Sequence, residues 1–293
     1  MCDKRAEIFN TSNRGKGIQT SYIAMHRVTL GELPMETRQP AVAGLFYADD
    51  PTQLSHDVDR LLHKHTRPTL PGVRALVVPH AGYAYSGDVA AAAYSCLTRG
   101  AEYKYILLIG PSHRVPFKGM AVPESGAFIT PLGDIPLARA QIDALVADDL
   151  VRYNSAAHFS EHSLEVQLPF LQRAEIRAPI LPVVIGDASP EQVARVLLPA
   201  LENSQVLTLI STDMSHFHSY YEARLIDGHT HKRILAGAED IRPDEACGCM
   251  GLNGLQHALS QSSYRMHLLQ HGNSGDTAGD QDRVVGYAAY AVY

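Results

Sequence analysis

Residues 76–87 run Leu-Val-Val-Pro-His-Ala-Gly-Tyr-Ala-Tyr-Ser-Gly, an apolar stretch that stops at a proline and passes through one histidine into a small, polar segment. This pattern predicts a buried strand, a loop at its carboxyl end and a following helix. Ligands of open α/β sheets bind in the crevice outside the carboxyl ends of the strands. His80 therefore lies where a functional residue is expected, although a histidine in such a loop is equally an ordinary side chain bonded to backbone.

Apolar runs alternate with helical periodicity over most of the chain. The runs predict strands at residues 76–78, 105–110, 180–185, 206–210, 264–269 and 284–292, with short strands and turns over 120–136. Helices are predicted from Pro51 onward and at residues 88–97, 138–148, 160–173, 190–201, 221–236 and 251–259. The alternation predicts an α/β fold with a mostly parallel or mixed central sheet and helices on both faces.

The composition is typical of a globular protein with a large core, because 45% of the 293 residues are hydrophobic and 19% are charged. A net charge of −6 without a basic patch argues against nucleic acid as a partner. No apolar run is long enough to span a bilayer, and the start lacks the apolar core of a signal peptide, so we expect a cytoplasmic location. We expect residues 1–37 to be a mobile extension and residues 38–293 a single domain.

Three predicted strands deliver polar side chains to their carboxyl ends: His80, His113, and Asp213 with His216. Imidazole is the commonest protein ligand of transition metals. Cys247 is a fourth candidate, because it opens a predicted helix whose N-terminus favours the thiolate. Two histidines and one anionic residue leave coordination positions open for a substrate or dioxygen, as in non-haem Fe(II) oxygenases.

Other motifs keep alternative interpretations open. His158-Phe159-Ser160-Glu161-His162 fits the H-x-x-E-H pattern of inverted zinc proteases, which would make the protein a zinc hydrolase with Glu161 as base. With Ser160 as the N-cap of its helix, His158 would lie off the required helical face. The pair Cys247 and Cys249 suits copper, and Cys96 is most simply a small buried hydrophobe.

Two further side chains also allow an ordinary structural interpretation. Tyr83 lines the cleft or packs its ring on the sheet edge. We expect Glu165 to lie on an exposed or half-buried helix face, paired locally.

Five motifs together resemble the Memo family, whose prokaryotic members are called the B protein of the AmmeMemoRadiSam system. They lie, in order, at residues 78–87, 110–113, 161–165, 211–216 and 246–248. The resemblance begins near Arg38 and runs to the C-terminus. It implies a fold like that of the class III extradiol dioxygenases, which open catechol rings with Fe(II) and dioxygen.

The resemblance also implies roles for individual residues. His80 and His113 match the two metal-ligand histidines, and Cys247 falls at the third ligand position, where the dioxygenases have a carboxylate. His216 matches the acid/base histidine, with Asp213 beside it, and His162 lines the same cleft. A small-molecule or peptide ligand would occupy the cleft, and the system's name implies a functional link to a radical-SAM protein.

The cysteine leaves the metal and the reaction open. Fold analogy implies Fe(II), whereas a thiolate is a softer donor that favours copper(I) or zinc without excluding iron. The main hypothesis is a metal-dependent, dioxygenase-like enzyme of unknown substrate. The alternatives are a scaffold that binds metal or a peptide without catalysis, and the zinc hydrolase.

Overall fold

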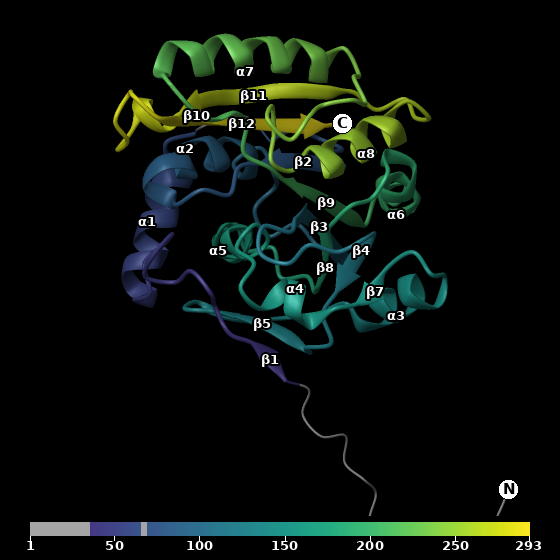
Figure 1. The fold of residues 1–293 in the computed structure, drawn as a ribbon. Helices are drawn as coiled ribbons and strands as arrows, with labels where there is room; N and C mark the ends of the chain where they lie inside the picture. The colour runs from purple at the N-terminus through teal and green to yellow at the C-terminus, as the bar shows by residue number, and fades with distance from the viewer. Residues whose placement is uncertain (1–35, 66–68) are drawn as a thin grey trace, which may run out of the picture. The chain divides into compact units, whose positions relative to one another are not determined.

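The centre of the fold is a nine-stranded mixed sheet in the computed structural model, which describes residues 36–65 and 69–293 (Figure 1). Its middle consists of four parallel strands in the order β2 (Ala75–Val78), β9 (Val206–Ser211), β3 (Tyr105–Pro111) and β8 (Ile180–Ile185). These strands are almost entirely buried, as apolar strands covered on both faces should be. Their carboxyl ends meet at one edge of the sheet.

Shorter or antiparallel strands extend the sheet on both sides. Beyond β2 lie β12 (Val284–Val292), β10 (His216–His218) and β11 (Met266–Asn273), all in antiparallel pairs. Beyond β8 lie β4 (Met120–Val122), which is antiparallel to it, and β7 (Arg152–Tyr153). A separate three-stranded sheet contains β1 (Thr37–Arg38), β5 (Ala127–Thr130) and β6 (Gly133–Pro136).

Two groups of helices flank the sheet (Figure 1). On one side, α6 (Pro190–Glu202) and α8 (Cys249–Leu259) pack on each other and against β9. The other group contains α1 (Pro51–His63), α2 (Tyr83–Tyr94) and α5 (Leu168–Arg173), with α2 against β2 and β12. The remaining helices are α3 (Arg139–Ala147), α4 (Ser155–Phe159) and α7 (Tyr220–Leu235), which lies along β11. The predicted α/β fold with a mixed sheet is confirmed.

The helix after His80 begins earlier than predicted. Gly82 is its N-cap, and the segment expected as a loop up to residue 87 is already its first turn. The Gly82 carbonyl accepts the N–H of Ser86, whose hydroxyl donates to the Ala81 carbonyl. These local bonds place His80 directly between the end of β2 and the start of α2.

The single helix predicted over residues 160–173 is wrong. The chain leaves α4 at Phe159, runs through a non-helical segment, and becomes helical again at a short 3-10 turn, Glu165–Gln167, that leads into α5. The Glu161 carboxylate accepts the N–H groups of the next two residues, which holds this segment out of a helix. Pro169 lies in the first turn of α5, where proline starts a helix and does not kink it.

Two further expectations concern the N-terminal residues and the absence of a membrane-spanning segment. The expected mobile extension over residues 1–37 lies outside the described residues except for its last two. In the part of the chain that the structure describes, no helix combines the length and apolar character needed to cross a membrane.

Candidate metal centre

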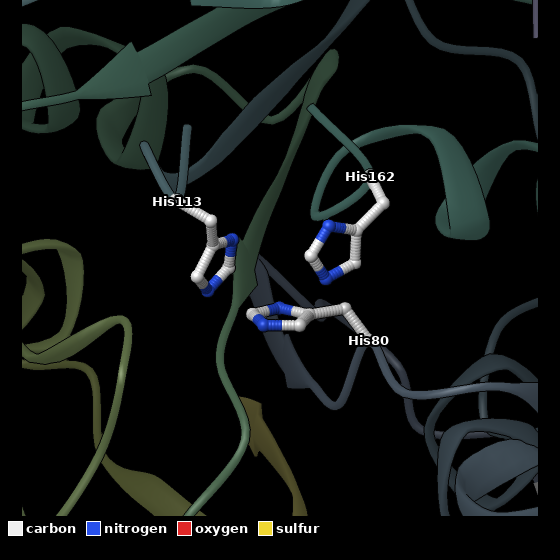
Figure 2. A group of neighbouring side chains, drawn as sticks. All are labelled: His80, His113 and His162. Atoms are coloured by element: carbon white, nitrogen blue, oxygen red, sulfur yellow. The ribbon is translucent and has the colours of Figure 1, made fainter. Parts of the chain in front are cut away.

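Three histidines from three segments converge at the carboxyl edge of the parallel strands (Figure 2). His80 follows β2, His113 follows β3, and His162 lies in the segment after α4. One ring nitrogen from each lies within 4.8 Å of the other two. Burial and the neighbouring histidines lower the pKa of His80 well below its usual range, and burial lowers that of His162 to about 4. Both rings are therefore neutral near pH 7, the form that binds metal.

The hydrogen bonds of Ser211 fix the tautomer of His80. The Ser211 hydroxyl donates its only proton to the Ser163 carbonyl, at 2.6 Å. His80 Nδ1, which lies 2.9 Å from the same oxygen, must then be the donor in that contact. The Gln167 amide donates to the same hydroxyl oxygen from the other side. His80 Nε2 therefore keeps its lone pair free.

Glu161 orients His113 in a similar way. Its buried carboxylate lies 2.9 Å from His113 Nδ1 and also accepts the His113 backbone N–H at 2.6 Å. Although burial opposes ionisation, the hydrogen bonds from His113 and from the Ser163 N–H hold the pKa of Glu161 down at about 2. A carboxylate behind a histidine fixes the ring and raises its basicity, which is the usual arrangement behind a metal ligand. The second nitrogen of His113 is left free for a metal.

Cys247 lies beside His80, with its Sγ 3.2 Å from His80 Nε2. The Asp213 N–H donates to the same sulfur at 3.3 Å. The expected thiolate is wrong for the metal-free protein: α8 begins only at Cys249, and burial raises the pKa of the Cys247 thiol. A metal ion would have to displace this proton on binding.

A cavity of about 570 Å³ opens beside this cluster and reaches His162, Asp213 and His216. The rest of its lining combines aromatic and aliphatic side chains with a loop before β12, and includes Leu45, Phe46, Tyr85, Asp280, Arg283, Val285 and Tyr287. A volume of this size suits a small-molecule ligand.

The structure does not bring Tyr83 to this cavity. Its hydroxyl donates to the Val166 carbonyl at 2.6 Å, and its ring packs 4.9 Å from that of Phe170. Tyr85, two residues further along α2, lines the cavity in its place.

Asp213 and His216 both line the cavity, but in the described part of the chain their side chains are not hydrogen-bonded to each other. Asp213 Oδ1 accepts the His80 N–H at 2.7 Å, and burial raises the pKa of this carboxyl to about 7. Burial also lowers the pKa of His216, so its imidazole is neutral and able to accept a proton.

The arrangement does not support the zinc-protease motif. His158 is buried away from the cluster, with its Nε2 3.0 Å from the Ala121 carbonyl. Glu161, the base in that scheme, is occupied by His113 and its own backbone neighbours. The motif assigned Glu161 the role of a catalytic base, whereas in the structure this carboxylate orients His113 and precedes His162 of the histidine group. Nothing in the local sequence indicated that Ser211 and Gln167 support His80.

We expect Glu161→Gln to weaken metal binding 10- to 100-fold, the usual effect of losing a carboxylate behind a ligand histidine. The amide offers only one acceptor oxygen where the carboxylate uses two, so the His113 ring loses its fixed orientation. Titration with Zn²⁺ in competition with a chelator measures the change. Glu202→Gln, an exposed glutamate at the end of α6, is the matched control and should bind as the wild type does. Equal affinity in the two variants would contradict this role of Glu161.

Comparison with known proteins agrees with the motifs. A family model described as Memo-like protein matches residues 38–291. The chain is similar to a MEMO1 family protein of Methanobrevibacter smithii, with 32% identity over 86% of this chain and 98% of the relative. It is similar to MEMO1 family proteins of Aquifex aeolicus (33%, covering 86% and 98%) and Methanosarcina mazei (34%, covering 88% and 100%). A solved structure, that of the uncharacterized protein JW3007 from Escherichia coli K12, aligns with a TM-score of 0.45 at 12% identity, over 88% of this chain and 99% of that one. Because the family match spans most of the sequence, this chain belongs to the Memo family.

Proposed function

We propose that the protein is a metal-dependent oxidoreductase with a dioxygenase-like cleft, in which His80, His113 and Cys247 hold one transition-metal ion. The observation that carries this proposal is the convergence of the three histidines beside a cysteine sulfur. Ser211 and Glu161 bond to the Nδ1 atoms of His80 and His113, which orients both rings and leaves the Nε2 atom of each available to a metal.

His162 is the alternative third ligand, since its nitrogen lies within the same 4.8 Å group. We place it on the substrate side because it also lines the cavity and packs against Phe46, 4.9 Å between ring centroids. A site with one thiolate and two imidazoles accepts iron, copper(I) and zinc. Fe(II) is our first choice, since the dioxygenase-like fold uses it.

The metal would supply Lewis acidity and, if it is iron or copper, one-electron chemistry toward dioxygen. The chain's own groups supply the rest. The cavity holds a small molecule or the end of a peptide beside the cluster. His216, neutral and facing the same space, accepts a proton from a ligand hydroxyl. Asp213 anchors the His80 backbone and so links the acid/base side of the cavity to the ligand side. A partnership with a radical-SAM protein and a cytoplasmic location complete the proposal.

Oxygen uptake tests the proposal. Protein loaded anaerobically with Fe(II) should consume dioxygen with at least one member of a panel of catechols and other phenols. His216→Gln should keep its iron but lose at least about 100-fold in rate, the range expected for removal of a general base. If the fully loaded wild-type protein consumes no oxygen with any phenol of the panel, the result contradicts the proposed oxidoreductase activity and favours the alternative of a non-catalytic scaffold.

A further inference from the structure

The mouth of the cavity carries an arginine on an exposed aromatic ring. The Arg283 guanidinium lies 5.0 Å from the centre of the Phe217 ring, and Phe217 is 62% exposed. Arg283 is the only lysine or arginine among the described residues that line the cavity. A guanidinium stacked on an aromatic ring is held in place while its N–H groups stay available.

Phe217 reaches this position at a cost in backbone strain. Its φ of 65° lies in the left-handed region, which is a genuine outlier for a bulky residue. Outliers of this kind persist where the surrounding structure requires them and cluster at ligand-binding sites. Phe217 directly follows His216, so the strained residue joins the proposed acid/base group to the arginine at the mouth.

The loop before β12 presents Arg283 by a fixed turn. Asp280 Oδ1 accepts the backbone N–H groups of Asp282 and Arg283, at 3.0 and 3.2 Å. The lining of the cavity also includes the aromatic side chains of Phe46, Tyr85 and Tyr287. The lining of the cavity thus combines aromatic side chains with one basic residue at the mouth, and it reaches His162 beside the proposed metal ligands.

We propose that the cavity selects a flat, apolar molecule with one carboxylate, which Arg283 binds at the mouth while the rest lies along the aromatic walls. A singly charged group is favoured over a phosphate, because the Asp280 carboxylate at the same rim repels a second negative charge. Arg283 and Phe217 are then specificity-determining residues. This inference names the ligand class for the cleft of the proposed function and rests on that cleft, but it does not require the metal.

The test uses the metal-free, full-length protein and three naphthalene probes: 2-naphthoate, 2-naphthalenemethanol and 2-naphthyl phosphate. Because the chain has no tryptophan, exciting the probes at wavelengths longer than tyrosine absorbs lets their fluorescence anisotropy be followed without background from the protein. We expect 2-naphthoate to bind at least about tenfold more tightly than the alcohol, since a hydrogen bond to a charged group contributes roughly this much. We also expect it to bind more tightly than the phosphate.

Arg283→Gln should remove the preference for naphthoate and leave the binding of the alcohol unchanged, whereas Phe217→Leu should weaken naphthoate binding about threefold. Arg195→Gln makes the same charge change at an exposed position on α6 and should bind as the wild type does. Equal binding of naphthoate and alcohol by the wild type, tighter binding of the phosphate, or a preference for naphthoate over the alcohol that survives in Arg283→Gln would each overturn the inference. Because no metal is present, these results are independent of whether the metal proposal fails.

Discussion

Replacing His80 by alanine is expected to abolish binding of the metal ion. His80 is buried, its free nitrogen lies 3.2 Å from the Cys247 sulfur, and its ring is part of the histidine group shown in Figure 2. His80 is the ligand that contacts both of the others, His113 and Cys247, so its removal leaves these two without the donor between them. Equilibrium dialysis against Zn²⁺ or Co²⁺, followed by metal analysis, should give one equivalent for the wild type and a negligible amount for the variant.

Two controls separate loss of a ligand from loss of folding. His158→Ala removes another buried histidine, which is bonded to a backbone carbonyl outside the cluster, and should keep its metal. Cys247→Ser should keep a weakened metal site, and its Co²⁺ form should lack the thiolate charge-transfer band of the wild type. Full metal content in His80→Ala would rule out the site. Absence of the band from the wild-type Co²⁺ form would leave His162 as the third ligand.

The place of the site could be predicted from the sequence because it depends on local patterns. The apolar runs that became β2, β3 and β9 predicted buried parallel strands, and such strands bring their carboxyl ends to one edge. His80 and His113 therefore had to lie near each other once the fold was correct. The resemblance to the Memo family, which the family match confirms, added Cys247 to the same group.

The hydrogen-bond partners that orient the ligand histidines could not be predicted in the same way. Glu161 reaches His113 across 48 positions in the sequence, and Ser211 reaches His80 across 131. Contacts of this kind depend on how loops meet after the sheet has formed, and they leave no periodic signal. The segment after α4 illustrates the point: its residues have helical spacing, but the hydrogen bonds of Glu161 prevent the helix.

Glu165 is a second residue whose long-range contacts could not be predicted from the sequence, and its contacts stabilise the fold. We expected it on an exposed or half-buried helix face, but the structure buries it completely. Its carboxylate accepts hydrogen bonds from the Arg38 guanidinium at 2.6 Å, the Tyr47 hydroxyl at 2.6 Å and two backbone N–H groups, those of residues 41 and 42. A carboxylate buried this deeply is tolerated only because every lone pair is used. It ties the first described segment of the chain to the turn before α5.

Arg38→Ala is expected to destabilise the protein by about 3–5 kcal/mol, because removing one partner of a buried ion pair leaves the other without compensation. Arg38 also donates to the carbonyls of His158 and Glu161, so its loss releases the segment that directly precedes His162. Urea unfolding should show a lower midpoint with an unchanged slope. Arg99→Ala, which removes an arginine from an exposed pair with Glu175, should leave the midpoint nearly unchanged. If the two variants unfold at the same urea concentration, the Arg38–Glu165 pair does not hold this part of the fold, and the position of His162 must be set by the loop alone.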